Sequence, residues 1–65
     1  MKILLGEIMY QKELTVRQVS IMTGISKSTI SRIMNGEISP TADTLESLAK
    51  GLKIRIGDLI DSPFK

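Results

Sequence analysis

Residues 16–34 contain two helix-forming stretches whose stop and start signals are separated by one residue. Gly24 is suited to the left-handed conformation that ends a helix, and Ser26 is a good N-cap for the next, so only Ile25 lies between them. Two short helices joined this closely must cross at a steep angle. Ser20 is small enough to let them approach, and Ile25 can fill the corner between them.

The spacing of apolar residues along the whole chain predicts an all-α fold, a compact bundle of about five short helices without a sheet. Asn35-Gly36 is interpreted as a helix stop rather than a hairpin turn, because alternating strand patterns are missing on both sides. A short strand at Ile54 and Ile56 is disfavoured because Gly57-Asp58 would interrupt it. Four of the expected helices cover residues 3–12, 16–23, 27–34 and 56–60. The other one lies before residues 56–60, begins at a cap formed by Ser39 or Thr41, and carries the apolar residues from Leu45 to Leu52.

The composition excludes several classes of function. The 65 residues suffice for one small domain, residues 1–65, and they include no cysteine and no histidine. We therefore expect no metal, no cofactor and no enzymatic activity, because the usual soft zinc ligands are absent and no nucleophile–base pair or metal cluster is apparent. Aromatic residues make up only 3%, which disfavours a protein that stacks single-stranded bases. The longest apolar run, Ile3–Leu5, is too short to cross a membrane, and we expect a cytoplasmic protein.

The outward face of the expected helix 27–34 is the informative surface. If Ile30, Ile33 and Met34 face inward, the 3.6-residue period turns hydroxyl, amide and cationic side chains outward and no carboxylate. Short hydroxyls allow close approach to the major groove, and Lys or Arg can reach guanine edges or phosphates. The net charge of +2 alone would not indicate DNA binding. The outward residues are Lys27, Ser28, Ser31, Arg32 and Asn35.

The stretch LTVRQVSIMTGISKSTISRIMNG followed by SPTADTLESLAKGL resembles the Xre family, the helix-turn-helix domains of phage Cro proteins and phage repressors. The similarity runs from Ile3 to about Ile60, and TGISKSTISRI is its most specific part. The resemblance implies a lambda-repressor-like fold with a helix-turn-helix core at residues 16–35. It also implies that the helix at about 27–34 reads the major groove of a double-stranded DNA operator, with the protein acting as a homodimeric transcriptional regulator or repressor.

The resemblance also implies roles for individual residues. The family often has Gln where this chain has Val16, and Arg17 is a candidate to take over that phosphate contact. Base-reading positions fall on Ser26, Lys27, Ser28, Ser31 and Arg32. Phosphate-binding positions fall on Thr15, Val16, Arg17, Thr29 and Asn35, the last through the nearby backbone.

Simpler interpretations remain beside these. Lys27, Arg32 and Arg17 could be ordinary solvated charges, and the same fold could serve as a protein-interaction module such as an antitoxin or anti-repressor component. Asp43 and Asp58 are best explained as acids in the first turns of helices, where they oppose the helix dipole. The last apolar residues either close the core or form a dimer interface, and they are Ile56, Leu59, Ile60 and Phe64.

Overall fold

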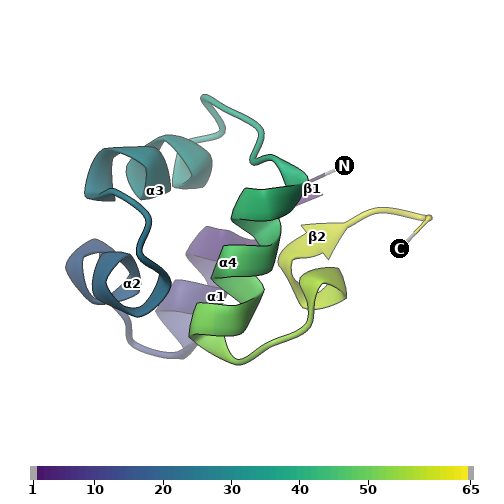
Figure 1. Ribbon diagram of the computed structural model, residues 1–65. Coiled ribbons are helices and arrows are strands. Elements are labelled where there is room, and N and C mark those ends of the chain that lie inside the picture. The colour runs from purple at the N-terminus through teal and green to yellow at the C-terminus, as the bar shows by residue number, and fades with distance from the viewer. Residues whose placement is uncertain (1, 65) are drawn as a thin grey trace.

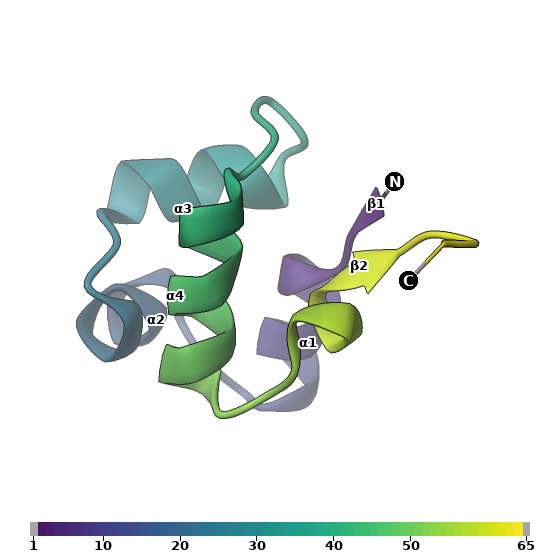
Figure 2. The same cartoon turned by 45° about the vertical axis from the view of Figure 1, so that its right-hand side comes forward.

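Four α-helices surround an aliphatic core in the computed structural model, which describes residues 2–64 (Figure 1). They are α1 (Leu5–Gln11), α2 (Val16–Thr23), α3 (Lys27–Met34) and α4 (Ala42–Leu52). The remaining elements are one turn of 3-10 helix, η1 (Ile56–Leu59), and the two-residue strands β1 (Lys2–Ile3) and β2 (Ile60–Asp61). Figure 2 shows α3 above α2 on one side of α4, with η1 and the strands on the other side. Within residues 2–64, no helix has the length and apolar character needed to cross a bilayer.

The core contains side chains from all four α-helices and from η1. No polar side chain of the described residues is buried in it. Both aromatic residues lie on the surface, with Tyr10 86% and Phe64 93% exposed, so aliphatic packing alone fills the interior. Each fully buried Leu or Ile side chain contributes about 1.5–3 kcal/mol through removal of apolar surface from water. The buried residues are Leu5, Met9, Val19, Ile30, Ile33, Leu48, Ala49, Leu52 and Leu59.

A small antiparallel sheet joins the two ends of the described chain, so the expectation of no sheet is wrong. Strand β1 pairs with β2, and the backbone N–H of Leu4 donates to the carbonyl of Leu59 at 2.7 Å. Ile3 lies in β1 instead of opening the first helix, which begins at Leu5. Both β-branched members of the pair, Ile3 and Ile60, pack against the core. The register pairs Lys2 with Asp61 and Ile3 with Ile60.

The prediction of a fifth helix over residues 56–60 is also wrong. This segment is a single 3-10 turn over Ile56–Leu59, and Ile60 already has extended backbone angles because it belongs to β2. The side chain of Asp58 accepts a hydrogen bond from the backbone N–H of Arg55 at 3.1 Å, which holds the start of this turn. Asp58 therefore has the structural role expected of an acid in a first turn, and Asp43 likewise lies in the first turn of α4.

Helix α1 ends with a non-glycine residue in the left-handed region. Glu13 has φ 55°, its N–H donates to the carbonyl of Tyr10, and the N–H of Leu14 donates to the carbonyl of Met9. This pair of hydrogen bonds forms the helix-ending arrangement that glycine favours. A side chain at Glu13 therefore makes the turn less stable than glycine would.

We expect Glu13→Gly to raise the free energy of unfolding by about 1 kcal/mol, because glycine adopts positive φ without a steric cost. Urea denaturation followed by circular dichroism measures this change. Glu46→Gly is the matched control, since Glu46 is exposed in the middle of α4, where glycine should lower stability by about 1 kcal/mol. A loss of stability in Glu13→Gly would contradict the explanation.

Candidate nucleic-acid interface

Three side-chain hydrogen bonds hold the turn between α2 and α3. Gly24 has φ 76°, as its predicted helix-ending role requires. The Ser20 hydroxyl donates to the carbonyl of Ile25 at 2.6 Å, so this small residue ties the corner as well as permitting the approach. The Thr23 hydroxyl donates to the carbonyl of Val19 at 2.7 Å and accepts the N–H of Ile25 at 3.3 Å. Polar contacts therefore hold Ile25, the residue of the turn, against the end of α2.

Helix α3 faces the core with one side only. Ile30 is fully buried and Ile33 is 3% exposed, which confirms the predicted inward face at these two positions. The prediction that Met34 also faces inward is wrong, because Met34 is the last residue of α3 and is 40% exposed there. The opposite side of α3 carries four of the predicted base-reading residues. Three of them are exposed, and the fourth, Ser31, is half-buried. The exposed residues are Lys27, Ser28 and Arg32.

Ser26 and Thr29 form a hydroxyl pair at the start of α3. The Ser26 oxygen accepts the N–H of Thr29 at 3.3 Å, and its hydroxyl donates to the Thr29 oxygen at 2.8 Å. Ser26 is thus the N-cap that the sequence predicted, and its hydroxyl proton is engaged in this contact. A serine or threonine hydroxyl has one donor and two acceptor positions. The proton of the Thr29 hydroxyl is not used in this pair, which suits Thr29 to donate to a phosphate oxygen.

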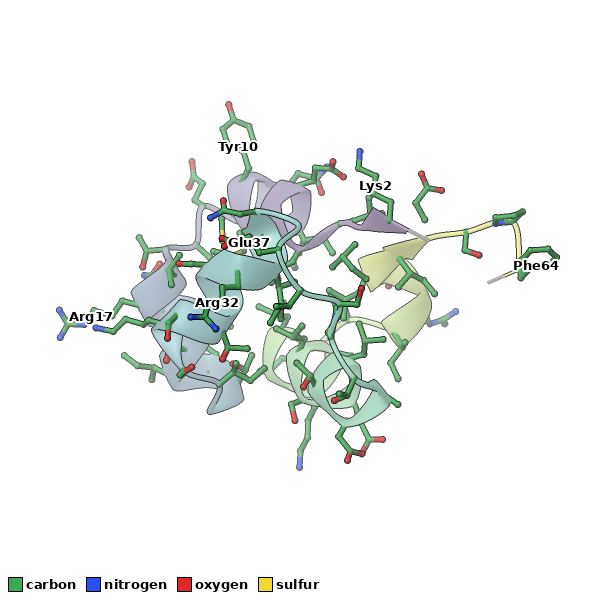
Figure 3. The ribbon with its side chains drawn as sticks, turned by 90° about the horizontal axis from the view of Figure 1, so that it is seen from above. Lys2, Tyr10, Arg17, Arg32, Glu37 and Phe64 are labelled. Atoms are coloured by element: carbon green, nitrogen blue, oxygen red, sulfur yellow. The ribbon has the colours of Figure 1, made fainter. Side chains whose placement is uncertain are left out.

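The start of α2 is held by a reciprocal cap. The Thr15 hydroxyl accepts the N–H of Gln18 at 3.1 Å, and the Gln18 side chain accepts the N–H of Thr15 at 2.8 Å. The role of Gln18 was not predicted, although Thr-x-x-Gln is the signature of this cap. Val16 packs against the core, so it can reach a phosphate only through its backbone N–H. Arg17 is exposed and projects away from the body in the view of Figure 3.

The end of α3 has a second feature that the sequence analysis did not single out. Gly36 has φ 73° and its N–H donates to the carbonyl of Ile33, while the N–H of Glu37 donates to the carbonyl of Arg32 at 2.9 Å. This turn places Glu37 directly after the helix (Figure 3). The amide Nδ2 of Asn35 donates to Oε2 of Glu37 at 3.4 Å. The side-chain amide of Asn35, whose nearby backbone is predicted to bind phosphate, therefore contacts a carboxylate of its own chain.

The charge distribution favours an anionic partner for α2 and α3. Residues 16–34 contain three cations and no acidic residue, although the whole chain has nine cations and seven acids. Neither helix has an acid in its first turn, so the partial positive charge of each N-terminus is left for an external anion. The cations are Arg17, Lys27 and Arg32, and all three are exposed.

The residues predicted as a dimer interface separate into two groups. Leu59 is fully buried in the core of its own chain, so it is removed from that set. It is the last residue of η1, and its carbonyl accepts the N–H of Leu4 directly before β2 begins. Ile56 is 42% exposed, Ile60 is half-buried, and Phe64 is 93% exposed beyond the end of β2 (Figure 3). Core closure, one of the two predicted alternatives, thus holds for Leu59 and in part for Ile60, which packs against the core. The dimer interface stays a prediction for the remaining residues.

Comparison with family models places a Cro/C1-type HTH DNA-binding domain over residues 5–65. The match therefore includes all four α-helices and the turn between α2 and α3. Searches of curated proteins and of solved structures gave no match.

Proposed function

Because this chain belongs to the Cro/C1-type helix-turn-helix DNA-binding domains, we propose that it is a transcriptional regulator that reads a double-stranded operator. In this proposal residues 1–65 form one domain, and α3 enters the major groove. The observation that carries the proposal is the outward face of α3, which is polar and cationic while Ile30 and Ile33 anchor the helix inward. A face of this kind can approach base edges without first removing an acidic side chain.

Base recognition is assigned to the exposed side of α3. Lys27 and Arg32 can donate to O6 and N7 of guanine, and Arg can do so with two hydrogen bonds. Ser28 can donate to or accept from a base edge. Ser26 and Ser31 are assigned smaller roles, because the Ser26 hydroxyl proton is engaged with Thr29 and Ser31 is half-buried.

Phosphate binding is assigned to the start of α2 and to both ends of α3. The Thr15 hydroxyl accepts the cap hydrogen bond and keeps its own proton for a phosphate oxygen. Arg17 adds a full positive charge in the first turn of α2, where Val16 also contributes its backbone N–H. Thr29 adds one hydroxyl donor. The end of α3 adds the backbone near Asn35 and, in this proposal, the Asn35 side-chain amide as a further donor.

The proposal includes a homodimer, because one helix of eight residues contacts too few bases to define an operator. The surface assigned to the dimer is Ile56, Ile60 and Phe64. Burial of the exposed Phe64 side chain would contribute about 1.5–3 kcal/mol per copy. In a two-fold dimer the same contact occurs twice.

Replacing Phe64 with serine should weaken self-association by at least about a hundredfold, because two buried side chains are lost from a symmetric dimer. Sedimentation equilibrium over a range of protein concentrations measures this change. Tyr10→Ser is the matched control, since Tyr10 is an aromatic residue that is 86% exposed and lies outside the proposed patch. Equal association of the two variants and the wild type would remove Phe64 from the interface.

The experiment that tests the function is selection of bound sequences from random duplex DNA. We expect enrichment of a two-fold symmetric sequence whose half-sites lie about 34 Å, or one helical turn, apart. Binding to that sequence should weaken steeply as salt increases, because phosphate contacts release counterions. Lack of enrichment, together with capture of a specific protein from the native host, would favour the interaction module instead.

A further inference from the structure

Glu37 is held next to the proposed DNA-binding surface by the backbone. Its N–H donates to the carbonyl of Arg32 at 2.9 Å, and the preceding Gly36 adopts the positive φ that completes the end of α3. The residue therefore cannot move away from the helix without breaking this terminal hydrogen bond. Its side chain is exposed, so no burial in the core draws the carboxylate away from the surface.

The carboxylate of Glu37 makes a contact of the kind that a DNA phosphate would make. Oε2 accepts a hydrogen bond from Nδ2 of Asn35 at 3.4 Å. An ionised carboxylate only accepts hydrogen bonds, and it carries a negative charge, as phosphate oxygens do. The Asn35 amide is a proposed phosphate donor, so an internal anion already contacts a position that DNA would use.

We propose that Glu37 competes with DNA phosphate for the Asn35 amide and thereby lowers the affinity of this domain for duplex DNA. This inference rests on the proposed function. Glu37 is the one acidic residue in the stretch from Thr15 to Ala42, which otherwise carries three cations. DNA binding near the end of α3 must bring a phosphate close to this carboxylate or displace it. Both routes weaken binding, by charge repulsion or by loss of the internal hydrogen bond.

The test compares Glu37→Gln with Glu46→Gln, a matched loss of one exposed carboxylate on α4. The probes are two duplexes of about 30 base pairs, long enough for two half-sites. One is the sequence that the wild-type protein selects from a random pool, and the other is an unselected sequence of the same length. We expect Glu37→Gln to bind both duplexes about threefold to tenfold more tightly at low salt, because a neutral amide oxygen holds the Asn35 amide less strongly than a carboxylate does and releases it to phosphate. Glu46→Gln should gain clearly less.

A double-mutant cycle separates competition from general repulsion. If Glu37 acts through the Asn35 amide, the gain from Glu37→Gln should shrink to that of Glu46→Gln when Asn35 is alanine. An undiminished gain in the Asn35→Ala background would overturn the competition. The inference also fails if Glu37→Gln and Glu46→Gln bind equally.

A measurement without DNA tests the contact between Asn35 and Glu37 separately from the proposed function. In the free protein, Glu37→Gln should shift the side-chain amide resonances of Asn35, whereas Glu46→Gln should leave them in place. Unchanged Asn35 resonances in Glu37→Gln would overturn the contact itself. Absence of any duplex binding by the wild-type protein, with the resonance shift present, would instead contradict the proposed function.

Discussion

Replacing Gly51 with alanine should lower the free energy of unfolding by about 2–3 kcal/mol, because the added methyl group has no space. A Cβ atom at this position would lie 2.7 Å from the carbonyl oxygen of Met22 and 2.9 Å from the Cα of Thr23. It would also lie 2.7 Å from the Thr23 Cγ2 atom. Two of these three atoms belong to the backbone, so a rotamer change cannot relieve the overlap. Helix α4 would have to move away from the end of α2.

Gly6→Ala is the matched control for this prediction. Gly6 also lies within an α-helix, but a Cβ there would meet no atom within 4 Å. Alanine should therefore stabilise α1 by up to about 1 kcal/mol through its higher helix propensity. Thermal and urea denaturation of both variants give the comparison. If the two substitutions have effects of the same sign, close contact between α2 and α4 does not explain the presence of Gly51.

The second large effect is expected at Arg32. Arg32→Ala should weaken binding to the selected operator by about 1–3 kcal/mol if the guanidinium bonds a guanine edge. Binding to unselected duplex should change much less, so the ratio of the two affinities should fall. Lys27→Ala should act in the same direction at its own base position. Both affinities must be measured at one stated salt concentration.

Arg55→Ala is the control for Arg32→Ala, because Arg55 is exposed and directly precedes η1. Element η1 lies on the side of α4 away from α3 (Figure 2). This variant should leave operator binding almost unchanged. An equal loss by Arg32→Ala on operator and on unselected duplex would reassign Arg32 to phosphate binding. No loss on either duplex would remove α3 from the interface and contradict the proposed function.

The corner between α2 and α3 could be predicted from sequence because its signals are local. The Gly24 stop and the Ser26 cap act within one turn of the residues they affect. The inward positions Ile30 and Ile33 follow from the helical period once that corner is placed. The prediction that Met34 faces inward was wrong, because the helical period gives the direction of a side chain but not the point along the helix at which the core ends.

The sheet could not be predicted in this way. Strands β1 and β2 are two residues each, too short for an alternating pattern, and their partners lie at opposite ends of the described chain. The burial of Leu59 depends on that pairing, so its assignment to an interface failed for the same reason. The contact between Asn35 and Glu37 depends on the conformation of the turn at Gly36, which the sequence indicated only as a helix stop.

The pairing of β1 with β2 sets the order in which a newly synthesised chain can reach its final form. Helices α2 and α3 and the turn between them have all their residues available by position 34, and their caps are local. The N–H of Leu4 has no backbone acceptor until Leu59 has left the ribosome, since that carbonyl is its partner. A translation product that stops before Leu59 therefore carries α2 and α3 but lacks the last buried side chain of the core, and we expect proteases to degrade it.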